Sequence, residues 1–275
     1  MSVRSATALR HEIEHALERS FPAALTPAQR TIRETASTGI AAVDGLLDGG
    51  LPVGAISEVN GPESSGRTTL VLSFLGQRTA AGQVCAWVDA DDAFDPESAA
   101  ANGVNLRRLL WVRCRKAGVP VRGKQEAKPW TQLDQALRAT DLLLQAGGFA
   151  SIVLDLGDTA VEHSRRIPLA TWFRFRQAAD RARTSLVVVA QAGTQRSIAQ
   201  SSSAVVLECS VVSPEIAGGT VLRGFRFEVK SERQRFTPFA AGRKKPPASV
   251  WPASAAWDAA RDLETADVLE MERRA

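Results

Sequence analysis

A short stretch near residue 60 constrains the fold more than any other part of this chain. Four residues separate Gly61 from Gly66, and Arg67 and Thr68 follow Gly66 directly, which gives the spacing G-x-x-x-x-G-[K/R]-[S/T]. An apolar run at 55–59 precedes the glycines and a second apolar run follows them. This arrangement predicts a strand, a tight loop and a helix, the setting in which backbone N–H groups and a helix start bind phosphate.

We therefore expect this loop to bind a nucleotide, ATP or ADP, together with Mg²⁺. The Thr68 hydroxyl is the predicted ligand of the cation. The residues expected to contact the nucleotide are Gly61, Pro62, Glu63, Ser64, Ser65, Gly66, Arg67, Thr68 and Thr69.

One position departs from the motif, because Arg67 stands where a lysine usually reaches the terminal phosphates. A guanidinium keeps the positive charge, but it is longer, planar and forked, so it cannot occupy the space of an ammonium group. The backbone amides of the loop do not depend on this side chain. The sequence thus predicts nucleotide binding with weak ATP hydrolysis or none.

The composition is that of a globular protein. The chain has 275 residues, of which 44% are hydrophobic and 23% charged, enough for one α/β domain with appendages. No apolar run approaches the roughly 20 residues that span a bilayer. Residues 1–18 carry acids within their apolar pattern and lack the apolar core of a secretory signal, so we expect no such signal there. Three widely spaced cysteines without a C-x-x-C pattern are expected to be buried free thiols, which favours the cytoplasm. The net charge of +4 is compatible with nucleic acid but does not establish it.

The chain divides into three expected parts. Residues 1–36 hold an amphipathic helix at 7–21 and a linker, residues 37–242 form the core, and residues 243–275 are a tail with a helix from about 254 to 272. The first helix cannot bury its apolar face alone. It either folds back on the core or docks on another molecule.

Within the core, apolar runs alternate with helical patterns. The expected strands lie at 55–59, 84–88, 109–114, 151–155, 185–190, 205–212 and 220–229, and the expected helices at 41–47, 70–80, 98–102, 130–145 and 169–183. This order predicts an α/β fold with a mainly parallel sheet flanked by helices. The alternating pattern at 220–229 suits antiparallel edge strands.

Ligands of such sheets bind at the carboxyl ends of the strands. Asp155 ends an apolar strand, where a carboxylate orients Mg²⁺ or its water. Asp91 is a candidate general base, or else a helix cap or a surface acid. Gln191 is a candidate phosphate sensor, or else a surface glutamine. The basic loop at 113–128 is either a solvated surface or a contact for an anion or a partner.

Several segments together resemble one family. Residues 37–39, 49–54, 61–70 and 88–96 and the strand ending at Asp155 resemble the core of the RecA recombinases in order and spacing. The resemblance covers residues 37–240 and implies a RecA-like phosphate-loop NTPase core. It also implies that the helix at 7–21 packs on a neighbouring protomer, which would allow self-association. The two DNA-binding loops of the family match 157–167 and 192–203, and both look shortened.

The departures from this family are as informative as the matches. Besides Arg67, the catalytic glutamate of the family appears as Asp91, which is one methylene shorter. A misplacement of about 1 Å can reduce a rate by about 10²-fold. The tyrosine that stacks on adenine would fall near Ser98, and the chain has no tyrosine. The C-terminal domain of the family is replaced by the short tail.

Basic residues suggest a weak contact with DNA. The stretch 223–245 holds eight basic and two acidic residues, and the connector at 157–167 adds further positive charge. The candidate DNA contacts are Arg165, Arg166, Arg233 and Arg235. We expect salt-sensitive binding that does not depend on base sequence.

These features are most similar to the ImuA group of RecA-like accessory proteins. The resemblance implies a role in the DNA damage (SOS) response, in which the chain supports error-prone translesion synthesis by contacting RecA or subunits of the mutagenic polymerase, including a Y-family polymerase homologue. The alternative is an active ATP-dependent recombinase or repair ATPase that binds single-stranded DNA. Other RecA-like ATPases, such as clock or inhibitor proteins, remain a third class.

Overall fold

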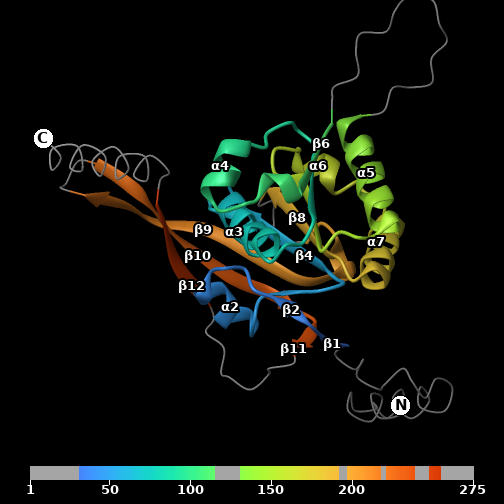
Figure 1. Ribbon diagram of the computed structural model, residues 1–275, viewed down its shortest axis with the longest axis horizontal. Coiled ribbons are helices and arrows are strands. Elements are labelled where there is room, and N and C mark those ends of the chain that lie inside the picture. Colours follow the sequence, from blue (N-terminus) through green and yellow to red (C-terminus); the bar gives the residue numbers. More distant parts are fainter. Residues whose placement is uncertain (1–30, 115–130, 192–196, 218–220, 239–247, 255–275) are drawn as a thin grey trace, which may run out of the picture. The chain divides into compact units, whose positions relative to one another are not determined.

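The computed structural model describes residues 31–114, 131–191, 197–217, 221–238 and 248–254. From Ile32 onward these residues belong to one compact unit. Its main element is an eight-stranded sheet in the order β12-β10-β9-β4-β8-β7-β5-β6 (Figure 1). The helix expected at 7–21, most of the basic loop expected at 113–128 and the tail beyond 254 lie outside the described residues.

The middle of the sheet is parallel, as predicted. Its strands are β4 (Ile56–Gly61), β8 (Ser185–Gln191), β7 (Ser151–Leu156), β5 (Cys85–Asp89) and β6 (Leu109–Arg113). Each is parallel to its neighbour in this order. The inner strands are almost continuous apolar runs because helices cover both of their faces.

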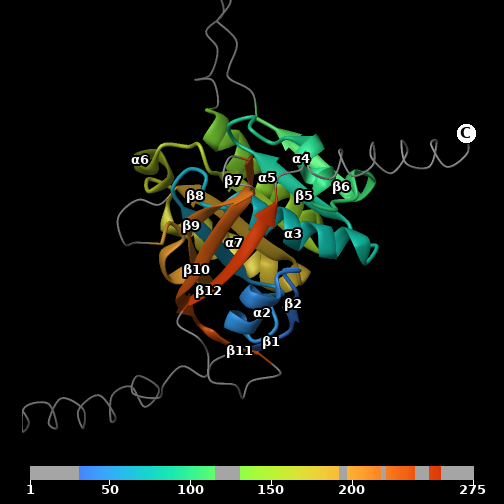
Figure 2. The ribbon, with the colours of Figure 1, turned by 90° about the vertical axis from the view of Figure 1, so that its left-hand side faces the viewer.

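Successive side chains along each strand point to opposite faces of the sheet. In β5, Cys85 and Trp87 pack on one side and Ala86 and Val88 on the other. The first side is covered by α2 (Ala41–Leu47), α3 (Arg67–Ala80) and α4 (Pro96–Ala101). The second side is covered by α5 (Gln132–Ala146) and α7 (Leu169–Ala182), and Figure 2 shows both layers. The cysteines at 85, 114 and 209 are buried and free, as predicted.

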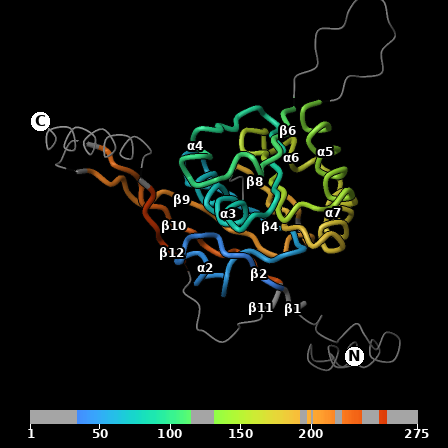
Figure 3. Tube along the Cα trace, in the orientation of Figure 1, coloured from blue at the N-terminus to red at the C-terminus, as the bar shows by residue number. Residues whose placement is uncertain are grey.

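An antiparallel edge extends the sheet. β9 (Ser203–Ala217) runs parallel to β4, while β10 (Val221–Gln234) and β12 (Ala248–Ser254) follow antiparallel to their neighbours. Figure 3 shows β9 and β10 continuing together past the part of the sheet that the helices cover. Both strands are longer than the sequence predicted.

β12 was not predicted, since this segment was expected to belong to a tail whose helix begins near residue 254. The physical reason is Trp251, which is 5% exposed and stacks on Phe227 of β10 with ring centroids 5.6 Å apart. Burial of two aromatic rings stabilises an added edge strand, and no local pattern reports that contact.

Smaller elements complete the described unit. β1 (Thr31–Arg33) pairs with β11 (Phe236–Pro238), and β2 (Thr35–Ala36) pairs with β3 (Leu51–Pro52), so strands occupy the end of the expected linker. α6 (Val161–Ser164) lies inside the connector that was expected to be a loop. Two 3-10 turns, η1 (Leu106–Arg108) and η2 (Gln200–Ser202), precede β6 and β9. Within the described ranges, no helix is both long and apolar enough to cross a membrane.

The register of the parallel strands aligns their carboxyl ends. Gly61 at the end of β4 pairs with Gln191 at the end of β8, and Asp155 of β7 pairs with both Val189 and Asp89. The predicted nucleotide loop, cation ligand and phosphate sensor therefore emerge at one edge of the sheet.

Candidate functional site

The loop between β4 and α3 has the geometry of a phosphate cradle. Ser64 and Gly66 have φ angles of 58° and 85°, which turn the backbone so that α3 begins directly above the strand end. The first-turn amides of any helix lack helical acceptors and carry its positive dipole end. The sequence of the loop therefore places free N–H donors over the edge of the sheet.

Close packing beneath this loop explains its two glycines. A Cβ atom on Gly66 would lie 2.7 Å from Cγ of Phe227, and one on Gly61 would lie 2.6 Å from the carbonyl oxygen of Cys209. Both neighbours belong to the antiparallel part of the sheet. The loop is thus held in place by β9 and β10, which contribute no residue to the motif.

Arg67 does not extend into open solvent. Its residue is 7% exposed, and Nη1 donates a hydrogen bond of 2.6 Å to the carbonyl oxygen of Ala190 near the end of β8. The positive charge lies close enough to lower the pKa of both Asp155 and Cys209 against the stronger effect of their burial. The arginine thus contributes charge to the site while one of its donors is bound to the protein itself.

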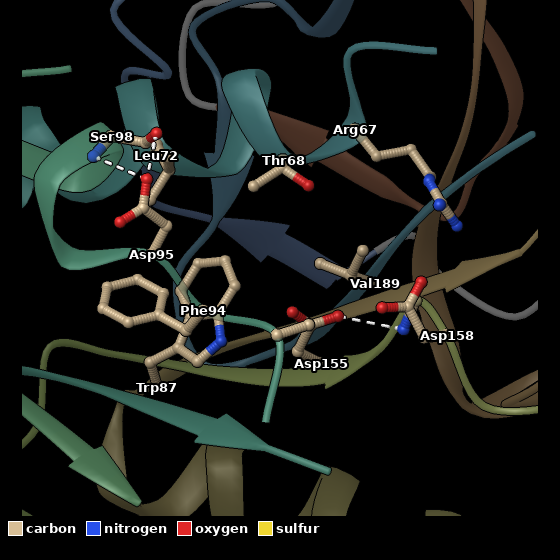
Figure 4. A pocket seen from close by; sticks show the side chains of 12 residues that line it. Arg67, Thr68, Leu72, Trp87, Phe94, Asp95, Ser98, Asp155, Asp158 and Val189 are labelled. Carbon is tan, nitrogen blue, oxygen red and sulfur yellow. Dashed lines mark hydrogen bonds between the residues drawn. The ribbon is translucent and has the colours of Figure 1, made fainter. Parts of the chain in front are cut away.

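A cavity of about 220 Å³ opens beside Arg67 and Thr68. Figure 4 shows Arg67 at one end, Asp95 and Ser98 at the other, and Thr68 and Asp155 on facing sides. The described residues that line it are Arg67, Thr68, Leu72, Trp87, Ala93, Phe94, Asp95, Ser98, Asp155, Gly157, Asp158 and Val189. Whole small-molecule pockets are typically about 300–1,000 Å³, so this cavity suits one part of a nucleotide.

Asp155 is the carboxylate best placed to meet a cation. Burial raises its pKa to about 7, the nearby charges of Asp89 and Asp158 add to that rise, and the amide of Gly157, which donates to Oδ1 at 2.9 Å, opposes it. A bound cation would favour the ionised form.

The donor set fits Mg²⁺ and a phosphate group. A hydroxyl and a carboxylate face each other across the cavity, and magnesium prefers a few such oxygens with water and phosphate completing its shell. No cluster of three or more His, Cys, Asp or Glu side chains that could hold a metal ion occurs among the described residues. Two buried polar atoms, Oγ of Ser65 in the loop and Nε1 of Trp87 in the cavity wall, have no hydrogen-bond partner in the described part of the chain.

The acidic residues at the end of β5 and just after it mostly form hydrogen bonds and ion pairs within the protein. Asp89 is 1% exposed and accepts from the amides of Ala93 and Phe94 at 3.0 Å and from Nε1 of Trp111 at 3.1 Å. Asp92 forms a two-point ion pair with Arg113. These contacts fix the turn that carries Asp91 and Phe94.

Asp91, the candidate general base, accepts a 2.6 Å hydrogen bond from Oγ1 of Thr159. Neither Asp91 nor Gln191 is among the described residues that line the cavity. Gln191 is partly buried and ends β8 beside the loop, directly before residues 192–196, which lie outside the description. Both roles remain predictions.

The end of the cavity expected to receive a base is polar at its rim and aromatic at its floor. Ser98 donates to Asp95, which caps α4 by accepting from the amides of Glu97 and Ser98. Phe94 stacks on Trp87 with centroids 4.8 Å apart. Sequence reasoning missed both aromatic residues because an aromatic residue in an apolar strand is normally core. The signal available in the sequence was that the two aromatic residues lie on either side of Asp89, at the strand end where a ligand is expected.

Glu58 was also missed as a functional candidate. It lies in the middle of β4, is 0% exposed and accepts hydrogen bonds from the hydroxyls of Ser197 and Ser203 and from the amides of Ile198 and Ala199. A carboxylate needs several such donors to be buried without a cation. It therefore anchors the segment matched above to a DNA-binding loop, and a lone acid within an apolar strand was the signal.

The four candidate DNA-binding arginines do not form one surface. Arg165 and Arg166 follow α6 beyond the carboxyl end of β7 and are exposed. Arg233 pairs with Val206 near the start of β9, and Arg235 donates to the carbonyl of Ser201 at 3.0 Å. Because β9 runs parallel to β4, these two lie at the opposite ends of the strands from the loop.

Comparisons with known proteins agree with this geometry. The family model described as the RecA N-terminal domain matches residues 6–163. The chain is 42% identical over 120 residues to Protein RecA of Pseudomonas fluorescens, covering 43% of this chain and 30% of that protein. It is 41% identical over 123 residues to Protein RecA of Ruegeria pomeroyi, covering 44% of this chain and 31% of that protein. The matched segment thus spans less than a third of either relative.

A solved structure, the crystal structure of the RadB recombinase, aligns with a TM-score of 0.54 at 20% sequence identity. The alignment covers 78% of this chain and 94% of that one. At this identity the likeness concerns the fold, and it supports the mainly parallel α/β core with antiparallel edge strands.

Proposed function

The chain belongs to the RecA N-terminal domain family, and from that premise we propose that it is a RecA-like accessory protein of the DNA damage response. In this role it binds a nucleotide, hydrolyses it slowly or not at all, and supports error-prone translesion synthesis through contacts with RecA or with subunits of a mutagenic polymerase, in the cytoplasm. The observation that carries the proposal is the hydrogen bond from Arg67 to Ala190 beside an otherwise intact phosphate cradle.

Nucleotide binding is supported by groups that the arginine does not replace. The loop amides and the start of α3 bind phosphate oxygens, and Thr68 and Asp155 orient the cation. Bound Mg²⁺ would supply charge neutralisation at the phosphates. Phe94 and Trp87 line an aromatic part of the cavity wall, where they exclude water.

Slow hydrolysis is supported by two positions. Asp91 is one methylene shorter than a glutamate, and its carboxylate already accepts a hydrogen bond from Thr159. A general base must lie within hydrogen-bond reach of the water it activates. The guanidinium of Arg67 is bound to a backbone carbonyl, so it is less free than a lysine ammonium to follow the charge of a transferring phosphoryl group.

The test combines binding and turnover in the full chain. We expect calorimetry to detect Mg-ADP and Mg-ATP binding, while ATP hydrolysis with single-stranded DNA stays near the buffer background. The double variant Arg67→Lys with Asp91→Glu restores the family's side chains, and we expect it to hydrolyse ATP at least about tenfold faster. Rapid DNA-stimulated turnover by the wild type would overturn the accessory role and favour the alternative.

That alternative is an active recombinase or repair ATPase that binds single-stranded DNA. The observation in its favour is that Thr68 and Asp155 face each other across the cavity (Figure 4). The partner contacts are tested separately by co-purification of the full chain with RecA and with the polymerase subunits. Deleting residues 1–25 should abolish that association, or self-association, if the expected helix at 7–21 carries it.

A further inference from the structure

Trp87 lines the cavity and carries a buried polar atom that no other contact explains. The residue is 1% exposed on β5 and lines the cavity, yet its Nε1–H finds no hydrogen-bond acceptor among the described residues. Trp111 on the neighbouring strand differs, because its Nε1 donates to Asp89 at 3.1 Å. Buried N–H groups normally have a partner. Trp172 and Trp251 also carry an Nε1 without one among the described residues, but Trp87 alone of the three lines the cavity, where an entering acceptor would pair with it.

The packing around Trp87 fixes the direction of this donor. Its ring stacks on Phe94 with centroids 4.8 Å apart. Figure 4 shows the nitrogen-bearing edge of the indole turned toward the middle of the cavity, on the side of Asp155, and the other edge beside Phe94. The N–H cannot rotate away without moving a buried ring pair.

The strand register places this donor close to the cation ligand. Trp87 pairs with Val153 on β7, two residues before Asp155, and both side chains belong to the α3 face of the sheet. Thr68 faces them from the start of α3, and Arg67 supplies positive charge. An acceptor between these groups is therefore an anionic oxygen held near the cation.

We propose that the indole Nε1–H of Trp87 is a ligand-binding donor that hydrogen-bonds a phosphate oxygen of a nucleoside diphosphate or triphosphate bound at the loop. This inference rests on the nucleotide binding proposed above. It makes Trp87 a residue that positions the phosphates, in addition to the loop amides, and it gives the otherwise unpaired donor its acceptor.

The first measurement follows the donor directly. In the full chain labelled with ¹⁵N-tryptophan, the Nε1–H resonance of Trp87 is the one missing from the Trp87→Phe variant. If that variant does not fold, the resonance is assigned by elimination with phenylalanine variants of the five other tryptophans. We expect titration with Mg-ADP to shift this resonance strongly and to slow its exchange with solvent. A resonance unmoved at saturating Mg-ADP would overturn the inference.

The second measurement compares affinities by calorimetry. Trp87→Phe keeps a large ring and removes only the donor edge, and we expect Mg-ADP to bind about tenfold more weakly. Trp172→Phe is the matched control, because Trp172 is also fully buried with an Nε1 that is unpaired within the described ranges, but it lies on the opposite face of the sheet. The control should bind within about twofold of the wild type.

The outcomes separate the two proposals. Wild-type affinity in a folded Trp87→Phe variant overturns this inference and leaves nucleotide binding intact. No Mg-ADP binding by the wild type overturns both. An equal loss of affinity in Trp87→Phe and Trp172→Phe also overturns the inference, because it shows a general effect on the fold.

Discussion

Nη1 of Arg67 donates a hydrogen bond of 2.6 Å to the backbone carbonyl oxygen of Ala190. This contact joins the first residue of α3 to the penultimate residue of β8, across 123 positions of sequence. The side chain that departs from the motif thus links the phosphate loop to the strand that leads into residues 192–203.

The same contact predicts a stability effect of Arg67. Arg67→Met removes a charged donor from the carbonyl of Ala190, whose residue is fully buried. We expect the free energy of unfolding to fall by about 1–2 kcal/mol, measured by urea denaturation without nucleotide. Arg166→Met is the control, since that exposed arginine should change stability little. Unchanged stability of Arg67→Met would mean that the hydrogen bond contributes nothing in solution.

Asp155 predicts a pH dependence with a defined sign. Burial raises its pKa from 3.8 to about 7. Between these values the folded protein keeps a proton that the unfolded chain releases, so stability falls as the pH rises through this window and the full penalty is present above about pH 7. Asp155→Asn removes this titration. Its unfolding free energy relative to the wild type should be about 2 kcal/mol more favourable at pH 8 than at pH 4.

The control for this experiment is Asp95→Asn. The hydroxyl of Ser98 and the first amides of α4 lower the pKa of the exposed Asp95 carboxyl below its ordinary value of 3.8, so the stability that its charge adds is lost only at more acidic pH. Its replacement should therefore show little pH dependence between pH 4 and pH 8. Both measurements use urea denaturation in buffers that contain a chelator. A stability difference for Asp155→Asn that stays constant from pH 4 to pH 8 would contradict the raised pKa.

Glu58 predicts a local effect on the segment after β8. Glu58→Gln replaces one accepting oxygen by an NH₂ group that faces hydroxyl and amide donors. We expect a loss of about 2–3 kcal/mol in unfolding free energy and earlier proteolytic cleavage near residues 197–203. Glu162→Gln, at an exposed position, should change neither quantity. Cleavage at the wild-type rate would argue against the anchoring role.

Gly66 predicts a steric effect that can be separated from backbone strain. Gly66→Ala places a methyl group 2.7 Å from the ring of Phe227 at a φ of 85°, whereas Gly103→Ala meets the same kind of φ, 82°, with no atom within 4 Å. We expect Gly66→Ala to lower stability by about 1–2 kcal/mol more than Gly103→Ala and to abolish Mg-ADP binding. Equal losses in the two variants would show that the Phe227 contact is relieved at no cost.

The basic residues predict a salt-dependent effect on DNA binding. We expect Arg165→Gln with Arg166→Gln, and separately Arg233→Gln with Arg235→Gln, to weaken binding of labelled oligo-dT in fluorescence anisotropy. For every DNA phosphate that a variant no longer neutralises, the slope of log affinity against log salt should fall by about 0.7. The exposed pair Arg107→Gln with Arg181→Gln is a control of equal charge. An equal effect of all three pairs would show that only net charge matters.

Much of the fold follows from local patterns. The run of apolar residues in Ile152–Leu154 predicts a strand covered on both sides, and the strand–loop–helix around Gly61 and Gly66 predicts where a phosphate would lie. The antiparallel edge strand at 220–229 follows from its alternation. β12 cannot be predicted in this way. The contact of Trp251 with Phe227 joins two segments, and neither segment's own sequence indicates that it pairs with the other.

The sequence by itself determined the α/β class, the position of the phosphate loop and the sheet edge at which Asp155 and Gln191 emerge, because these depend on residues close together in the chain. Only the tertiary structure decided that Arg67 binds Ala190, that Asp91 binds Thr159, that Trp87 faces the cavity and that the two arginine pairs lie at opposite ends of the strands. The direction of a side chain is set by neighbours that are distant in sequence, and strand order brings those neighbours together.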